Sequence, residues 1–331
     1  MDLKINEVFA ELHEAIDGNE EKNIRKLILP DVPHYLSLGL SSGNIYFSVE
    51  ISERLEPQLK AIPKIKGLNI SARTFNDERP KYFSLTMAPV DKSFQDAFLV
   101  FASDVIASFI NEPEDKLFGI LVARLQHWQH FFTPQPIRFL SRERQLGLLG
   151  ELYFLEEMLN TEVTPYEALS FWTGPAGKSK DFCIKNLVDF EVKAVLNDAE
   201  IVKISSEHQL DITAEKLYLA VYNFVNGSDC SENLNTAVHR LKIKLKDHDD
   251  AFMFFCSLLL ASGYTEAHSE YYESLQIALK DMRIYTVETD FPRITDCNTS
   301  YGVFGVKYNL SLLACEPYLT AENVNDIIAK I

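Results

Sequence analysis

The amino-acid sequence predicts an α/β fold, in which a mixed sheet is flanked by helices and preceded by a smaller α/β region. Runs rich in β-branched and aromatic residues alternate with amphipathic runs at helical spacing, a pattern typical of strands connected by helices. Hydrophobic residues make up 47% of the chain and charged residues 24%, as in ordinary folded proteins. The 331 residues suffice for one large core or for two domains.

The first part of the chain, residues 1–115, is predicted to be an accessory α/β region. Its expected elements are a helix at 1–16, strands within 35–51, at 68–75 and at 82–87, and a helix at 93–110. The polar stretch Asn111–Asp115, which contains a proline, is the expected boundary. The second domain therefore covers residues 116–331 and begins with a helix that stops at the prolines of 133–136.

The second domain is expected to contain a core in the order helix, strand, strand, strand, helix, strand. These elements are expected at 142–160, 180–184, 188–195, 201–205, from 206 onward, and at 217–224. The first helix carries leucines at helical spacing from Leu148 to Leu159, which predict a buried face. Ser206 and Gln209 have the spacing of a capping box, which predicts that the second helix begins there.

The two strands at 180–184 and 188–195 carry the candidate active site. If they pair as a hairpin centred on Asn186, Asp181 lies directly opposite Glu191. Opposed side chains of this kind have Cβ atoms roughly 4.5–5.5 Å apart, so the two carboxylates repel unless a cation lies between them. Mg²⁺ is commonly held by one or two carboxylates. Lys193 shares the face of Glu191, where it orients a water or offsets phosphate charge. The alternative is an exposed hairpin with solvated charges.

Glu151 is the candidate acidic residue on the helix at 142–160. It lies at the edge of the leucine face, where a buried carboxylate is costly without a partner. Gly147 and Gly150 each cost about 1 kcal/mol relative to alanine in a helix, which suggests that something packs close to them. The alternative is a half-exposed glutamate on a surface helix.

Two further segments are candidate phosphate contacts. The glycine-rich loop that leads into Asp181 carries Lys178 and Lys180, which make it locally basic. The expected helix start at Ser206 and Gln209 offers free amide donors to a phosphate. A solvated loop and a simple helix cap are the respective alternatives.

The chain is acidic, with a net charge of −16, which counts against nucleic-acid binding through bulk electrostatics and predicts weak binding by the isolated chain. A nuclease with one local basic patch is compatible with this charge, as is a need for a partner protein. The most basic stretch, 232–246, is either a solvated helix face or a DNA-facing patch. No apolar run is long enough for a membrane span, the N-terminus lacks signal-peptide features, and five scattered cysteines give no disulfide framework. These features predict a cytoplasmic protein.

The order Asp181, Glu191-x-Lys193 resembles the PD-(D/E)XK nuclease superfamily, although no proline precedes Asp181. More narrowly, three further motifs are similar to those of an uncharacterised bacterial family of PD-(D/E)XK proteins: Gly147-x-x-Gly150-Glu151-Leu152, Phe171-Trp172-x-Gly174 and Ser205-Ser206-Glu207-x-Gln209-Leu210. The resemblance implies a restriction-endonuclease-like core. It also implies that the helix before the catalytic strands supplies an acid, for which Glu151 is the residue that fits.

The resemblance further implies a metal-dependent endonuclease that hydrolyses nucleic-acid phosphodiester bonds, most simply of DNA, in restriction or defence. Asp181, Glu191 and Glu151 would hold Mg²⁺, or Mn²⁺ as a substitute, and Lys193 would position or help deprotonate the attacking water. Partners would be nucleic acid, a second copy of the chain, or a protein of a defence system. The alternatives are a noncatalytic interaction subunit that keeps the nuclease fold within a multi-protein system, and a metal-dependent hydrolase with another substrate.

Overall fold

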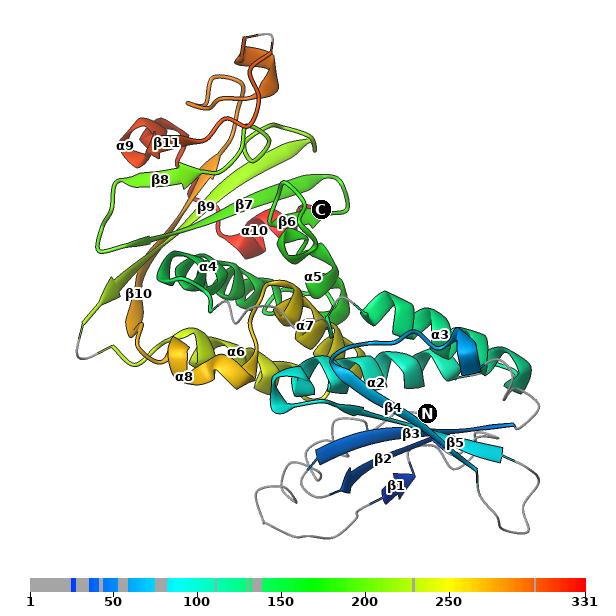
Figure 1. Ribbon diagram of the computed structural model, residues 1–331. Helices are drawn as coiled ribbons and strands as arrows, with labels where there is room; N and C mark the ends of the chain where they lie inside the picture. Colours follow the sequence, from blue (N-terminus) through cyan, green and yellow to red (C-terminus); the bar gives the residue numbers. More distant parts are fainter. Residues whose placement is uncertain are drawn as a thin grey trace. The chain divides into compact units, whose positions relative to one another are not determined.

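A computed structural model describes residues 25–27, 36–41, 44–52, 59–74, 82–110, 112–129, 131–132, 139–227, 230–300 and 302–331 (Figure 1). The chain forms two compact units, residues 1–138 and 139–331. The expected boundary after residue 115 therefore differs from the observed one. The reason is that helix α3 (Glu114–Trp128) packs against α2 (Gln95–Phe109) of the first unit. The helix expected at 1–16 lies outside the described residues.

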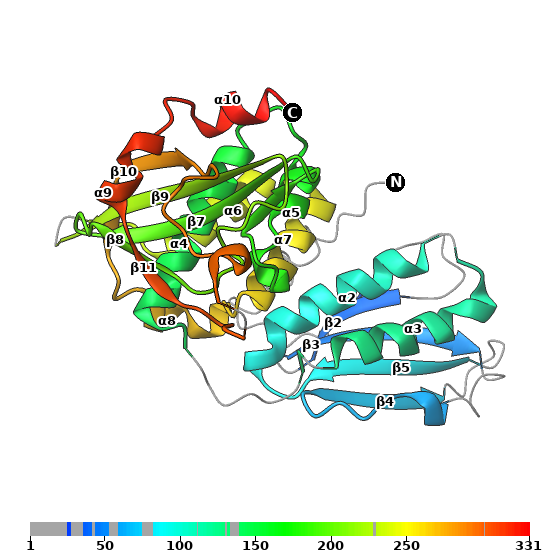
Figure 2. The same ribbon diagram turned by 90° about the horizontal axis from the view of Figure 1, so that it is seen from above.

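The first unit is an antiparallel sheet covered by two helices. Its strands follow the order β1-β2-β3-β5-β4, with bounds Arg25–Leu27, Leu36–Ser41, Asn44–Ser52, Tyr82–Pro89 and Leu68–Thr74. Figure 2 shows α2 and α3 side by side along this sheet. Phe98, Phe101 and Phe109 of α2 are buried between the two layers, as their helical spacing predicts. The strands and the helix expected between residues 35 and 110 are confirmed.

The second unit is a mixed four-stranded sheet with different layers on its two faces. The strands follow the order β10-β9-β7-β6, with bounds Ile277–Thr286, Lys216–Asn226, Val188–Leu196 and Phe182–Ile184. β7 and β9 run parallel, and the other pairs are antiparallel. The helices of the unit are α4 (Arg142–Met158), α5 (Pro165–Phe171), α6 (Leu234–Leu245), α7 (Asp249–Ala261), α8 (Ser269–Tyr272), α9 (Leu312–Cys315) and α10 (Val324–Ile328).

Both faces of this sheet are covered, which explains why most residues of β7 and β9 are buried. Alternate residues of both strands point to opposite faces. Phe190 and Tyr222 belong to the core under α4, α6 and α7, whereas Val195 and Leu219 belong to a second core under β8 (Ile201–Ile204) and β11 (Tyr308–Ser311). Figure 1 shows these helices on one side of the sheet and β8, β11 and α9 on the other.

The expected helix and four strands are present as α4, β6, β7, β8 and β9, but the helix expected between β8 and β9 does not form. β8 does not pair with the main sheet; it pairs with β11, about 100 residues later. Residues 205–213 form turns, not the helix expected from Ser206. Of the two expected capping residues, Gln209 uses its side chain to accept from the Ser205 N–H at 2.6 Å. The neighbouring Glu207 carboxylate accepts from the N–H groups of residues 305 and 306, each at 2.8 Å.

The hairpin of β6 and β7 has the predicted register. Phe182 pairs with Phe190 and Ile184 with Val188, so the hairpin is centred on Asn186. Lys185 and Asn186 both adopt left-handed backbone angles, with φ of 51° and 59°, which lets three residues reverse the chain. Among the described residues, no helix is long and apolar enough to cross a membrane.

Candidate active site

The hairpin brings Asp181 against β7, where the sequence predicted it. The carbonyl oxygen of Asp181 accepts from the N–H groups of Thr173 and Gly174, at 2.8 and 3.0 Å. Its side-chain Oδ2 accepts from the Val192 N–H at 2.8 Å. Both ends of Asp181 are therefore fixed by backbone donors, and Oδ1 is the oxygen left for another ligand.

Glu191 and Lys193 lie on the face of β7 that turns away from α4. Lys193 Nζ lies 2.7 Å from Glu191 Oε1 and donates to Gln209 Oε1 at 3.3 Å. The Glu191 side chain is 0% exposed, and neither of its oxygens accepts a well-formed hydrogen bond among the described residues. Because Oε2 has neither the hydrogen bond nor the ion pair that buried charges normally have, Glu191 carries an unsatisfied acceptor.

Glu151 reaches the same place from α4, and it is held by Trp172. The indole Nε1 of Trp172 donates to Glu151 Oε2 at 2.7 Å. A Cβ atom at Gly174 would lie 3.0 Å from Glu151 Oε2 and 3.2 Å from Asp181 Oδ1, so both oxygens face this glycine. Glycine at 174 therefore keeps the space between the two carboxylates free of a side chain.

Burial raises the proton affinity of all three carboxylates, and the charge of Asp181 adds to this effect at Glu191 and Glu151. Burial, followed by the charge of Asp181, raises the pKa of Glu191 to about 8. Burial also raises the pKa of Asp181, which Lys193 partly offsets. Burial and then the charge of Asp181 raise the pKa of Glu151 well above its usual range. Burial alone would lower the pKa of Lys193, but Glu191 and Asp181 outweigh it and raise the pKa.

This donor set fits a hard divalent cation. Mg²⁺ and Mn²⁺ prefer carboxylate oxygens, and the group offers the unpartnered Glu191 Oε2 together with the two oxygens that face Gly174. The three carboxylates do not bring oxygens all within 4.8 Å of one another in this structure. Among the described residues, only Glu207, His208 and Asp296 do so, and both oxygens of Glu207 already accept backbone N–H groups.

Three predicted substrate contacts have surroundings other than those expected. Lys180 was expected in an exposed basic loop, but it is 2% exposed and its Nζ donates to the His208 carbonyl oxygen. Ser206 and Gln209 were expected at a helix start, but they lie in the turn after β8, where Gln209 holds the Lys193 ammonium. Lys178 is exposed, as predicted.

Sequence reasoning missed Trp172 and Gly174 as parts of the site. Their motif was recognised without a role, and the only signal was an aromatic and a glycine just before an acid-bearing strand. The two glycines of α4 differ in their packing. A Cβ atom added at Gly150 would lie 3.2 Å from the Ala194 Cβ, whereas a Cβ atom added at Gly147 would have nothing within 4 Å. Close packing therefore explains Gly150 alone.

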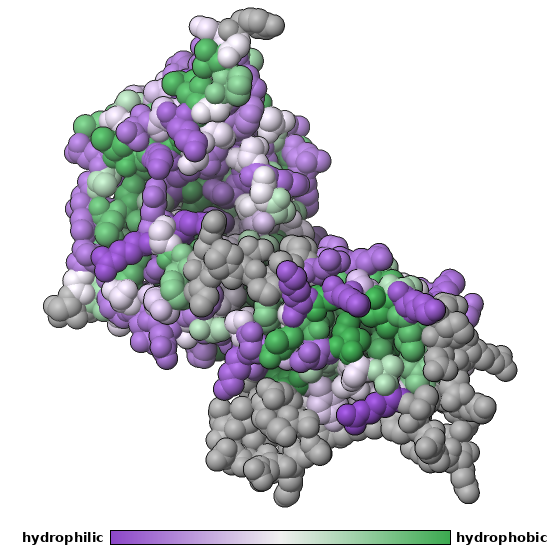
Figure 3. Space-filling view, viewed as in Figure 1, coloured by the Kyte–Doolittle hydropathy of each residue, from purple (hydrophilic) through white to green (hydrophobic). Residues whose placement is uncertain are grey.

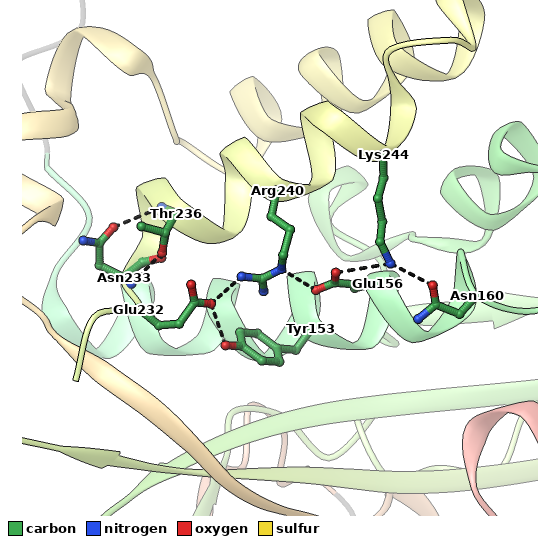
Figure 4. A network of polar contacts seen from close by, with 8 residues as sticks. All are labelled: Tyr153, Glu156, Asn160, Glu232, Asn233, Thr236, Arg240 and Lys244. Atoms are coloured by element: carbon green, nitrogen blue, oxygen red, sulfur yellow. Dashed lines mark hydrogen bonds and ion pairs between the residues drawn. The ribbon is translucent and has the colours of Figure 1, made fainter. Parts of the chain in front are cut away.

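Two basic residues of α6 are ion-paired with carboxylates of the same chain. Arg240 contacts the carboxylates of Glu156 and Glu232, at 2.8 and 2.6 Å, and Lys244 lies 3.2 Å from Glu156 (Figure 4). These contacts join α6 to α4. Arg240 and Lys244 therefore do not count as unpaired cations for the DNA-facing interpretation of residues 232–246.

The mixed sheet, the helix before it and the Asp181, Glu191-x-Lys193 group together define a protein of the PD-(D/E)XK class. The chain belongs to the family DUF4420, described as "Putative PD-(D/E)XK family member", whose model matches residues 5–313. No curated protein and no solved structure matched the chain.

Proposed function

We propose that this protein is a metal-dependent nuclease that hydrolyses phosphodiester bonds of nucleic acid, with DNA as the first substrate to test. The observation that carries the proposal is the unpartnered, fully buried Glu191 Oε2 beside two further carboxylates. A purely structural ion pair with Lys193 would need neither Asp181 nor Glu151 nearby. Membership of the PD-(D/E)XK family supports the same class of activity.

In this proposal Asp181, Glu191 and Glu151 hold Mg²⁺ or Mn²⁺. The bound ion would polarise the phosphoryl group and stabilise the negative charge that develops on it. Lys193, whose pKa is raised by Glu191 and Asp181, is an ammonium that donates to the attacking water or to a phosphate oxygen and does not act as a base. Gln209 keeps that ammonium in place through its 3.3 Å contact.

The test is cleavage of supercoiled plasmid with Mg²⁺ and then Mn²⁺. We expect nicked or linear product from the wild type, and none from Asp181→Ala, Glu191→Gln or Lys193→Met. Asp189→Asn is the matched control, because Asp189 lies on the same face of β7 two residues earlier but is held by the Thr213 hydroxyl at 2.9 Å. Product formed equally by the wild type and Glu191→Gln would refute the assignment of the site.

The second candidate is a noncatalytic subunit that keeps the nuclease fold within a multi-protein system. The acidic net charge of −16 favours it, as does the pairing of Arg240 and Lys244 with Glu156 of the same chain. Thermal unfolding separates the two candidates. Under the nuclease proposal Mg²⁺ raises the Tm of the wild type more than that of Glu191→Gln, because the ion binds only the folded site. Under the noncatalytic alternative, Mg²⁺ changes the Tm of neither the wild type nor Glu191→Gln.

A further inference from the structure

Helix α4 contains a glycine that packing does not explain. A helix-interior glycine costs about 1 kcal/mol relative to alanine. Gly150 is accounted for, because Ala194 of β7 leaves no room for a side chain. At Gly147, one turn earlier, a Cβ would meet nothing within 4 Å. Gly147 therefore faces open space that no described residue fills.

Gly147 lies on the face of α4 that carries Glu151. Positions three, four and seven apart share a helix face, which places Arg144, Gly147 and Glu151 in one row. The Glu151 carboxylate at the end of this row is held by Trp172 and faces Gly174. Arg144 is exposed, and in the described part of the chain it has no ion-pair partner. The row thus consists of the exposed cation Arg144, the glycine at position 147 and the Glu151 carboxylate of the candidate site.

This row borders the open part of β7. β6 pairs with β7 only at Val188–Phe190, so residues 192–196 have no strand on that edge among the residues described. Gly150 brings α4 against this segment. The space-filling view is hollowed over β7, between β8 and α4, and hydrophilic residues form most of the rim (Figure 3).

We propose that the Arg144–Gly147 turn of α4 binds the nucleic-acid backbone beside the scissile phosphate. The proposal rests on the proposed nuclease function and names the surface that the substrate uses. Gly147 lets the sugar-phosphate backbone lie directly against the helix, and Arg144 forms an ion pair with one flanking phosphate. Gly147 is therefore a substrate-positioning residue, and Arg144 is a substrate-binding residue.

The first test replaces Gly147 by leucine and compares it with Gly119→Leu. Gly119 is the matched control, because it is a glycine inside α3 with nothing within 4 Å of a Cβ. Both variants should be more stable than the wild type, since leucine favours helix. Only Gly147→Leu should raise the KM for a DNA duplex, by 10-fold or more, with kcat within twofold. Its Tm shift with Mg²⁺ should match that of the wild type.

The second test uses the salt dependence of DNA binding. Arg144→Gln should reduce the slope of log K against log salt by about 1, because one phosphate contact is lost. Arg142→Gln should leave the slope unchanged, because Arg142 lies nine residues before Glu151 on the opposite side of the helix.

Three outcomes would overturn the inference. If the wild type cleaves DNA and Gly147→Leu has the same KM as Gly119→Leu, the inference fails while the nuclease function stands. An unchanged salt slope in Arg144→Gln also overturns it. If the wild type neither binds nor cleaves nucleic acid with Mg²⁺ or Mn²⁺, both proposals fall together.

Discussion

At the scale of single residues, the site is a balance between three buried or half-buried carboxylates and one ammonium. Lys193 compensates only part of this charge, and Glu191 Oε2 accepts no hydrogen bond in the described structure. Burial and then the charge of Asp181 raise the pKa of Glu191 to about 8, so the group takes up protons when no cation is bound. Proton uptake and ion binding are therefore alternative ways of neutralising the same oxygens.

The first prediction concerns stability against pH without a divalent ion. The folded pKa of Glu191, about 8, lies above its unfolded value, so the folded state binds the extra proton between roughly pH 4.5 and pH 8. Stability therefore falls as pH rises through this window. Glutamine does not titrate, so the stability of Glu191→Gln does not fall in this way. Relative to the wild type, its free energy of unfolding should increase by up to about 1.4 kcal/mol per pH unit in this window.

Urea unfolding at pH 5, 6, 7 and 8 measures this difference. Adding Mg²⁺ at pH 8 should restore stability to the wild type and not to the variant. A difference between the two proteins that stays constant from pH 5 to pH 8 would contradict the assigned shift.

The second prediction concerns the indole that holds Glu151. Trp172→Phe removes the donor to Glu151 Oε2, a bond that lowers the pKa of Glu151. We expect weaker Mg²⁺ binding, with a larger deficit at pH 7 than at pH 9, because the carboxylate is more often protonated at the lower pH. Titration calorimetry at the two pH values measures the effect. Trp128→Phe is the control, because Trp128 makes the same kind of bond to Asp104 in the other unit. An equal effect of both variants would count against a role at the site.

At the scale of elements, the local sequence was sufficient to predict a structure whose strands are joined by only a few residues. The β6–β7 hairpin was predictable in its register, because Lys185-Asn186-Leu187 can turn and both strands are rich in β-branched or aromatic residues. The β8–β11 pair was not, because its strands are about 100 residues apart and the turn after β8 is held by residues 293, 305 and 306. These distant residues contact the Leu210 carbonyl oxygen and the Glu207 carboxylate, whereas Gln209, which suggested a helix start, contacts Ser205 and Lys193.

The candidate site divides in the same way. Asp181, Glu191 and Lys193 follow from the hairpin alone, and Glu151 follows from the helix before it. The burial of Lys180 could not be predicted, because its partner is a carbonyl oxygen in a turn that the sequence read as a helix. Local pattern identifies the acids, whereas distant contacts decide what surrounds them.

The third prediction tests the contact between α4 and α6. Arg240→Ala leaves the half-buried carboxylates of Glu156 and Glu232 without their shared cation, so we expect a loss of about 1–3 kcal/mol in the free energy of unfolding. Lys246→Ala, at the exposed end of the same helix, should change it by no more than about 0.5 kcal/mol. Urea unfolding compares them, and equal losses would show that Arg240 adds only a surface charge.

At the scale of the whole molecule, the chain consists of two compact units with separate cores. The candidate carboxylates all belong to residues 139–331. The role of the first unit, proposed as an accessory region, is therefore separable from ion binding by experiment.

The fourth prediction follows from this division. Heating should give two calorimetric transitions, and Mg²⁺ should raise only the one that belongs to residues 139–331, because an ion stabilises the unit that binds it. Proteolysis after partial unfolding identifies which unit each transition represents. A single transition that moves as a whole with Mg²⁺ would show that the two units unfold together.

The turn after β8 also has a consequence for the order of events during synthesis. Asp181 and Glu191 are ten residues apart, so a local hairpin brings them together as soon as that stretch is made. The turn that carries Gln209 is fastened by Arg293 and by the backbone at Gly305 and Val306. A ribosome adding 5–20 residues per second needs several seconds to supply them. During that interval the acids are paired but not yet enclosed, and an ion can enter from water before the last strands arrive.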